Sequence, residues 1–515
     1  MIPTFLAFQT ASRALAASQA NINITGNNIA NANTEGYSRQ RVDLSSFSTG
    51  GSSQKFATPN YAGSLGVQIT GIGQIRDIFL DARYRNENSN SGMYDKVLAG
   101  LKDLENVLDE LSTAGLQEEL LDFTRQLQTL SESPTSEELT LVVRTSAQKV
   151  TQIMNVYARQ LSEAREQAIY DLSNVVVNNE FNTLVKNIAS LNEQIKKEHT
   201  YRNNPNELLD KRNLLIDQLS NIANIKVTVT PDKISEDIIV ENLEISIYDE
   251  KTGISIGLID NGLYNELSVI ERDGKISLEL TGAFDAHDTD DITDHFSSGA
   301  IKGYLDIING SGIYADTAKG ENDFRGTLYY MNAMDTFAAT FAKVFNDLND
   351  IDPGDENAMP LFSANDGSGI ITAANIAISE EWINSSTYIN TSKIPGGDND
   401  NVLRMINAME GKLDFYMDVE NEAGLVFKGT FNEYMTGLIG ELSLDISLYK
   451  NFSDTSDAVL TSLFNSRESI SGVNLDEEGI NLMAHQKAYN AAARYFTILD
   501  EAIDRIINNM GVAGR

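Results

Sequence analysis

Large apolar side chains recur every seven positions in the first 33 residues, and a row of small side chains runs beside them with the same spacing. The large row is Phe8, Leu15, Ile22 and Ile29, and the small row is Thr4, Ala11, Ser18, Thr25 and Ala32. Because an α-helix repeats about every 3.6 residues, each row falls on one stripe of a helix. Asn, Gln, Ser and Ala fill most of the remaining positions, so the pattern predicts a helix suited to protein neighbours.

The C-terminus repeats this pattern more strongly. Its row is Leu475, Leu482, Tyr489, Phe496, Ile503 and Met510. In the later half, apolar positions alternate by four and three, which is typical of a coiled-coil seam. We expect the first and last segments to pair with each other, in a parallel or an antiparallel direction.

The paired ends are expected to be marginally stable by themselves. One narrow seam buries few large side chains, whereas each ordered residue costs roughly 1–2 kcal/mol of backbone entropy. We therefore expect both ends to be mobile in the free subunit and to order against other copies or partners. The competing interpretation is a private helical hairpin sealed against the chain's own core.

Between the two ends, the spacing of apolar residues changes from helical to strand-like and back again. Helical spacing predicts helices over about 75–112, 116–132, 137–198, 207–221 and 325–349, and again from 431 onward. Alternation with a period of two predicts an antiparallel β domain, and Pro- and Gly-rich turns mark a second insert. The predicted fold is mainly α with β-rich inserted domains: an elongated, multidomain helical stalk whose N- and C-terminal helices pair as a coiled coil.

The expected domain boundaries follow these changes. The two terminal helices are expected at 1–33 and 475–515 and form a unit of their own. The stalk is expected at 34–224, which includes an extended segment, and at 296–349 and 428–474, with inserts at 225–295 and 350–427.

Charge is concentrated in the two inserts. The chain of 515 residues has a net charge of −35, of which 225–295 contributes −12 and 350–427 contributes −11. Residues 1–60 have a net charge of +2. We therefore expect solvated inserts and ends suited to burial, with an ordinary acidic surface as the alternative. A chain this acidic repels phosphate backbones and anionic lipids, so we expect neither a nucleic-acid nor a membrane partner.

Candidate chemistry is sparse. The chain has no cysteine and 4 histidines, and its start lacks the basic and apolar blocks of a cleavable secretory signal. An acidic cluster of Asp288, Asp290, Asp291 and Asp294 lacks the glycine turn and distal glutamate of a calcium loop, so a solvated loop is the favoured interpretation. We expect no metal, no cofactor and no enzymatic activity.

Three runs resemble one known family. Residues 25–40, with Asn28-Ile29-Ala30-Asn31 and a following Gly36-Tyr37, resemble the signature of axial proteins of the bacterial flagellum. The ending Tyr37-Ser38-Arg39-Gln40 is similar to the hook-associated protein 1 (FlgK) family. Residues 469–489 resemble that family's C-terminal signature, and residues 207–217 its helix before the β region. Glu35 departs from the family, which usually has Pro there, and this should loosen the turn before Gly36.

The resemblance implies a secreted structural protein of the flagellum, located at the junction between hook and filament. Such proteins leave through the flagellar type III export channel without a cleaved signal, while a chaperone binds the C-terminal helix. The resemblance further implies a ring of about eleven subunits, with hook protein and a second hook-associated junction protein as partners. The terminal helices would then line the inner tube.

The candidate site residues divide into two groups. The assembly-interface candidates are Phe8, Leu15, Ile22, Ile29, Leu482, Tyr489, Phe496, Ile503 and Met510. The candidates for capping and turn formation after the first helix are Asn27, Asn28, Asn31, Asn33, Gly36 and Tyr37. A purely structural turn role for the asparagines, without subunit contact, stays open.

Two alternatives to the junction protein stay open. Another axial protein, from hook or distal rod, is the closer one, although residues 37–40 and 471–474 favour the junction protein. A surface adhesin with a helical stalk and binding inserts is the more distant one, and it predicts well-ordered ends in the monomer.

Overall fold

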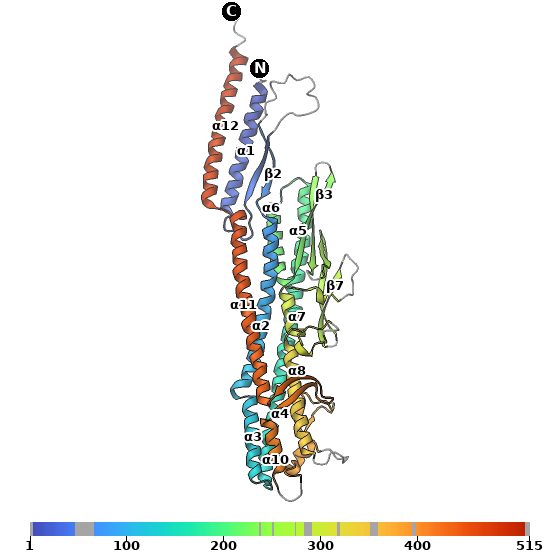
Figure 1. The fold of residues 1–515 in the computed structure, drawn as a ribbon. Coiled ribbons are helices and arrows are strands. Elements are labelled where there is room, and N and C mark those ends of the chain that lie inside the picture. Colours follow the sequence, from blue (N-terminus) through green and yellow to red (C-terminus); the bar gives the residue numbers. More distant parts are fainter. Residues whose placement is uncertain are drawn as a thin grey trace, which may run out of the picture.

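The computed structural model is an elongated stack of helices, with the two terminal helices side by side at one end (Figure 1). The described residues are 4–46, 66–235, 238–249, 252–272, 274–282, 291–316, 320–350, 359–393 and 398–509. The predicted fold class, mainly α with β-rich inserts and paired terminal helices, is confirmed.

The terminal unit contains α1 (Thr4–Ala30), α12 (Leu475–Asn509) and a two-stranded ribbon of β1 (Gln40–Ser46) and β2 (Val67–Gln74). The helices are antiparallel, because Phe8 meets Phe496 at one end and Asn28 meets Glu478 at the other. The ribbon also contacts α1. The open question of direction is thereby settled.

Below the terminal unit, α2 (Ile78–Ala114) runs beside α11 (Phe431–Ser471) through the upper part of the stalk (Figure 1). Serine hydroxyls join them, since Ser453 donates to Asp95 and Ser456 donates to Glu87. The lower stalk adds α3 (Leu116–Glu132), α4 (Glu137–Tyr170) and α8 (Thr327–Asn349). Its core is aromatic, and its largest fully buried side chains include Phe123, Phe337, Phe341, Phe345, Phe362 and Trp382.

Helix ends follow the capping signals of the sequence. The side chain of Asp77 accepts hydrogen bonds from the first turn of α2, and Gly115 separates α2 from α3. Ser136 caps α4, which begins where the helix over 137–198 was predicted to begin. Thr430 and Glu433 form a reciprocal capping box at the start of α11.

The long predicted helix over 137–198 contains a π-helical segment that the sequence analysis missed. Between α4 and α5 (Asn182–Thr200), the residues Asp171–Phe181 form the π-helix η2. Its buried side chains are Leu172, the adjacent pair Val176 and Val177, and Phe181, and the pair lies four or five residues from each of the other two. This spacing suits the wider turn of a π-helix, and a search for the 3.6-residue period overlooks it.

A five-stranded antiparallel meander follows α6 (Asn206–Ile222), in the order β3-β4-β5-β6-β7. Its strands are Ile225–Ser235, Ile238–Tyr248, Ser255–Asp260, Leu263–Arg272 and Lys275–Gly282. The sheet shares a second hydrophobic core with η2, α5, α6 and α7 (Ala300–Asn309). The short 3₁₀-helices η3 (Thr293–His295) and η4 (Gly312–Tyr314) flank α7.

The second insert is built of short elements attached to the lower core. They are β8 (Phe362–Ala364), β9 (Ile376–Ile378), α9 (Glu380–Asn384), η6 (Ser386–Tyr388), α10 (Asp400–Glu410), β10 (Leu413–Asp418) and β11 (Ala423–Gly429). Strand β8 pairs with β9, and β10 pairs with β11.

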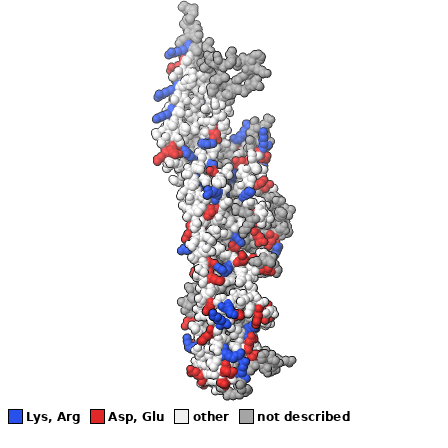
Figure 2. All heavy atoms as spheres, in the orientation of Figure 1, with Lys and Arg blue, Asp and Glu red and all other residues white. Residues whose placement is uncertain are grey.

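Charge differs between the two ends of the molecule. Figure 2 shows acidic and basic side chains intermixed over the stalk and inserts, and both kinds also occur along α12. Among the residues of α1, Arg13 alone is charged. The N-terminal helix is therefore almost uncharged, unlike α12, the stalk and the inserts.

Candidate functional site: the joint between the terminal helices and the stalk

The two predicted apolar rows face each other at their outer end. The rings of Phe8 and Phe496 pack with their centroids 4.0 Å apart. In an antiparallel pair, seven residues forward along α1 correspond to seven residues back along α12. This register places Leu15 level with Tyr489, and Ile22 level with Leu482.

The row residues are only partly covered. Phe8, Leu15, Ile22, Ile29, Leu482, Phe496 and Ile503 are half-buried, and Tyr489 is 36% exposed. Met510 lies outside the described residues. The side chains of α1 that are fully covered are mostly small or polar: Ala11, Ala17, Ile24, Thr25 and Asn28. The pair thus buries a narrower apolar strip than the two rows offer.

At the inner end of the pair, Asn28 satisfies all its side-chain hydrogen-bonding groups. Its amide nitrogen donates to the carbonyl oxygen of Gln40 at 2.9 Å and to Oε2 of Glu478 at 3.1 Å. Its oxygen accepts from the hydroxyl of Tyr37 at 2.9 Å and from the backbone nitrogen of Gln40 at 3.0 Å. Asn28 is 1% exposed, so it fixes the turn after α1 from inside.

Arg39 continues this network to the C-terminal helix. Its guanidinium reaches Oε1 of Glu478 at 2.7 Å through Nη2 and at 2.9 Å through Nε, and it reaches Glu477 at 3.2 Å. Its backbone nitrogen donates to the carbonyl oxygen of Ser471 at 2.8 Å. Asn474 caps α12 by accepting from the backbone nitrogens of the first turn. The N-terminal and C-terminal signatures therefore form one hydrogen-bonded unit.

The remaining turn candidates differ in their contacts. The Asn31 side chain donates to the carbonyl oxygen of Asn27 and accepts from Thr34. Gly36 has φ +76°, a conformation that other residues rarely adopt. The side chains of Asn27 and Asn33 are exposed. Of the four predicted asparagines, Asn28 is the one whose side chain has a hydrogen bond to the C-terminal helix in the described residues.

A second polar cluster lies below the turn. Asp217 on α6 receives Arg85 on one oxygen and Arg467 on the other, each at 2.7 Å. Arg76 donates two hydrogen bonds to the carboxylate of Asp81, through Nε and Nη2, and a third to the Ser38 hydroxyl at 3.2 Å. The three arginines and two aspartates are largely buried. They tie together α2, α6, α11 and the turn.

Asp210 on α6 completes the cluster. Gln74 donates to its Oδ1 at 2.8 Å, and Arg76 lies at 3.9 Å. Burial raises the pKa of Asp210 to about 6, against the hydrogen bonds and the positive charge that favour its ionised form. Burial, with the nearby carboxylates Asp210 and Glu478, raises the pKa of Tyr37 to about 12, so its hydroxyl keeps its proton.

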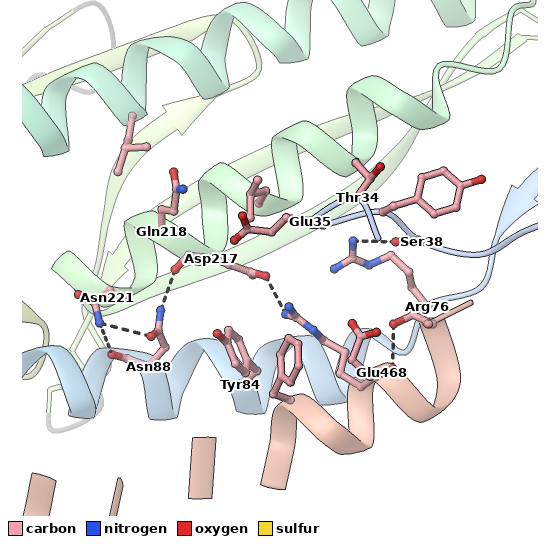
Figure 3. Close-up of a pocket in the computed structure, with 18 of the residues that line it drawn as sticks. Thr34, Glu35, Ser38, Arg76, Tyr84, Asn88, Asp217, Gln218, Asn221 and Glu468 are labelled. Atoms are coloured by element: carbon pink, nitrogen blue, oxygen red, sulfur yellow. Dashed lines mark hydrogen bonds and ion pairs between the residues drawn. The ribbon is translucent and has the colours of Figure 1, made fainter. Parts of the chain in front are cut away.

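A cavity of about 790 Å³ opens between the turn and the stalk (Figure 3). The turn lines it with residues 32–38, and the other walls come from α2, η2, α5, α6 and α11 and from residues next to their ends. Tyr84 and Asn88 face the cavity from α2. The Asn88 amide nitrogen donates to the carbonyl oxygen of Asp217 and to the hydroxyl of Ser220 on α6. The sequence analysis missed the cavity, because its walls come from segments far apart in the chain.

Other candidate chemistry stays separate from this joint. Of the acidic cluster, Asp288 and Asp290 lie outside the described residues, and Asp291 accepts hydrogen bonds from Thr293. Within the described ranges, no group of three or more His, Asp or Glu side chains is arranged to hold a metal ion. None of the helices in those ranges has the length and hydrophobicity needed to cross a bilayer.

Models of three flagellar protein families match separate parts of the chain. Residues 101–354 match the model for the flagellar hook-associated protein FlgK helical domain. Residues 8–37 match that for flagella basal body rod protein, and 466–510 match that for the C-terminal part of flagellar basal body rod FlgEFG protein.

Individual relatives cover the whole chain. Flagellar hook-associated protein 1 of Bacillus subtilis is 32% identical over 527 residues, covering 100% of both chains. The protein of the same name from Salmonella typhimurium is 24% identical over 563 residues, covering 96% of this chain and 98% of the relative. A solved structure of the flagellar hook junction protein FlgK from Burkholderia pseudomallei gives a TM-score of 0.41 at 17% identity, covering 56% of this chain and 46% of that chain. The full-length match to the Bacillus protein shows that this chain belongs to the family of flagellar hook-associated protein 1.

Proposed function

We propose that this chain forms the junction ring between flagellar hook and filament by polymerising through its two terminal helices. As a family member, it is an exported structural protein of the bacterial flagellum. The proposal concerns how the ring forms: about eleven copies assemble with α1 and α12 along the inner tube. The stalk and the acidic inserts then lie outside that tube.

The observation that carries the proposal is the poor burial of α12. Over residues 475–505, Glu478 is the one side chain that is fully buried. By contrast, α8 has 13 buried residues in 23. A long helix with so few buried side chains is marginally stable in water, so α12 has most of its contact surface available to other subunits.

The exposed surface of α12 is chemically suited to such contacts. Large apolar side chains stand in solvent along its length: Leu475, Ile480, Met483, Tyr489, Tyr495 and Ile498. Burying each would contribute roughly 1.5–3 kcal/mol. We propose that Phe8, Leu15, Ile22, Ile29, Leu482, Tyr489, Phe496, Ile503 and Met510 supply the assembly contacts, together with these exposed residues.

The same surface accounts for the proposed export partner. An apolar helix released into the cytoplasm before export would aggregate, since exposed apolar patches associate. We propose that a chaperone covers α12 until export through the type III channel. Hook protein and the second hook-associated junction protein are the proposed neighbours of the finished ring. The joint's arginines are paired with carboxylates, which supports a structural role without catalysis.

Electron microscopy of flagella tests the location. An epitope inserted at Gly367, in an exposed turn of the second insert, labels the assembled protein without touching the terminal helices. The proposal predicts label in one narrow band at the distal end of the hook. Label along the hook, rod or filament would identify another axial protein, and label on the cell surface without flagella would identify an adhesin.

A further inference from the structure

An exposed apolar pair stands beside the joint, at the start of α2. Ile78 is 83% exposed and Phe79 is 69% exposed. The Asp77 side chain accepts hydrogen bonds from the backbone nitrogens of Phe79 and Leu80, so this projection is held on a capped helix end. We call Ile78 and Phe79, with Arg83 stacked on the Phe79 ring, the knob.

We propose that the knob of one copy inserts into the joint cavity of the next copy around the ring. This inference rests on the proposed function, because it identifies a contact between neighbouring subunits. A closed ring needs two different, complementary surfaces on each subunit, one for each neighbour. The knob and the cavity are such a pair.

The direction of the side chains on α2 excludes insertion into the subunit's own cavity. Successive residues of an α-helix are rotated by about 100°. Phe79 therefore points about 140° away from Tyr84, and about 180° away from Asn88, and both of these line the cavity. One face of α2 forms a cavity wall, while Phe79, the aromatic ring of the knob, stands on the opposite face.

The two surfaces also lie at the same height along the stalk. At about 1.5 Å per residue, Phe79 precedes Tyr84 by about 8 Å and Asn88 by about 14 Å along α2. Two copies side by side in a ring then meet without a large axial shift. The cavity of about 790 Å³ is in the size range of small-molecule pockets, roughly 300–1,000 Å³, which is ample for two side chains.

Charge supports the same pairing. In a chain with 74 acidic and 39 basic side chains, Arg83 has no carboxylate partner among the described residues. Three carboxylates line the cavity without an ion-pair partner in those residues: Glu35, Glu180 and Glu468. Inserting the knob brings Arg83 toward this acidic rim. The apolar part of the lining includes Leu184, Leu214 and Phe464.

Cysteine cross-linking in assembled flagella tests the contact, because the natural chain has no cysteine. A double variant carries Phe79→Cys in the knob and Glu180→Cys at the rim. Oxidation is expected to produce a ladder of dimers, trimers and larger rings from purified flagella, and monomers from the free protein. The matched control carries Phe79→Cys with Leu444→Cys. Leu444 is exposed and lies on α11, far from the cavity, so this variant is expected to give no ladder.

Normal flagella without a ladder from the Glu180 pair, or an equal ladder from the control, would overturn the proposal. Single substitutions of Phe79 test the same contact even where the introduced cysteines disturb assembly. Phe79→Asp is expected to weaken ring formation about tenfold or more, as loss of an interface anchor does, while Phe79→Leu retains it. Full motility and filament number with Phe79→Asp would contradict knob insertion.

Failure of this proposal is distinguishable from failure of the proposed function. If Phe79→Asp assembles normally while the epitope stays in a band at the hook tip, the junction role stands and the knob contact is wrong. If the epitope lies elsewhere in the flagellum, the junction role is wrong, and the cross-link still reports whether neighbouring copies meet through the knob.

Discussion

Phe8 and Phe496 lie at opposite ends of the chain, yet their rings pack 4.0 Å apart between centroids. This contact sets the antiparallel register of the terminal helices. Because the paired rows are only half-buried, the contact defines a surface that neighbouring copies can complete.

Phe496→Asp is expected to abolish junction formation while the stalk stays folded. A carboxylate at this seam costs more to bury than the pair gains, and the stalk core does not include Phe496. Motility and filament counts measure assembly, and circular dichroism of the purified monomer measures folding. Phe496→Leu is the control and should retain assembly. Normal filaments in the aspartate variant would argue against the model.

Arg39→Ala is expected to loosen the joint by about 2–4 kcal/mol, because it leaves Glu478 without its cation in a buried site. Glu478 is 2% exposed. The rate of native-state proteolysis at residues 31–39 reports the opened population. Glu477→Ala is the matched control: its carboxylate is 60% exposed, so the expected change is below about 1 kcal/mol. Equal cleavage of both variants would show that the buried pair does not hold the joint.

Because of Asp210, the joint is expected to be more stable in mild acid than at neutral pH. Its pKa is about 6 in the folded state against an ordinary value of 3.8, so the folded chain binds this proton more tightly than the unfolded chain. Its contribution to stability is therefore greatest below about pH 4 and is lost as the pH rises through about 6.

Hydrogen exchange of the Arg39 amide at pH 5 and pH 7.5, corrected for intrinsic rates, measures this effect. Asp210→Asn should reduce the difference in opening free energy between the two pH values by about 1 kcal/mol. An unchanged difference in the asparagine variant would assign the pH dependence to other groups.

Gly92→Ala is expected to separate α2 from α6. A Cβ at this position would lie 2.1 Å from the carbonyl oxygen of Asn221, so one backbone has to move. Such overpacking typically costs about 1–3 kcal/mol, which exceeds the gain in helix propensity. Gly440→Ala on α11 is the control, since nothing lies within 4 Å of its added Cβ; it should raise the melting temperature. Equal melting temperatures for Gly92→Ala and the natural chain would contradict this close packing.

Local patterns predicted the elements well because each depends on neighbouring residues. The Ser136 cap and the seven-residue rows carry their own signals. The π-helix η2 was missed, because its buried side chains follow a wider period.

The joint was only partly predicted. Asn28 and Tyr37 belong to the N-terminal signature, but their common partner Glu478 is 450 residues beyond Asn28. The sequence did not predict the ion pairs of Arg76, Arg85 and Arg467, because a single arginine in a sequence does not reveal which carboxylate it contacts. The cavity could be found only in the tertiary structure, because five helices and a turn contribute to its walls.

Hydrogen exchange of α1 and α12 in the free subunit and in purified hook–filament junctions tests the central claim most directly. The account predicts that both helices exchange rapidly in the free subunit, because little is buried on them, and slowly in the junction, where neighbouring copies cover them. Strong protection of both helices in the free subunit, unchanged on assembly, would contradict it.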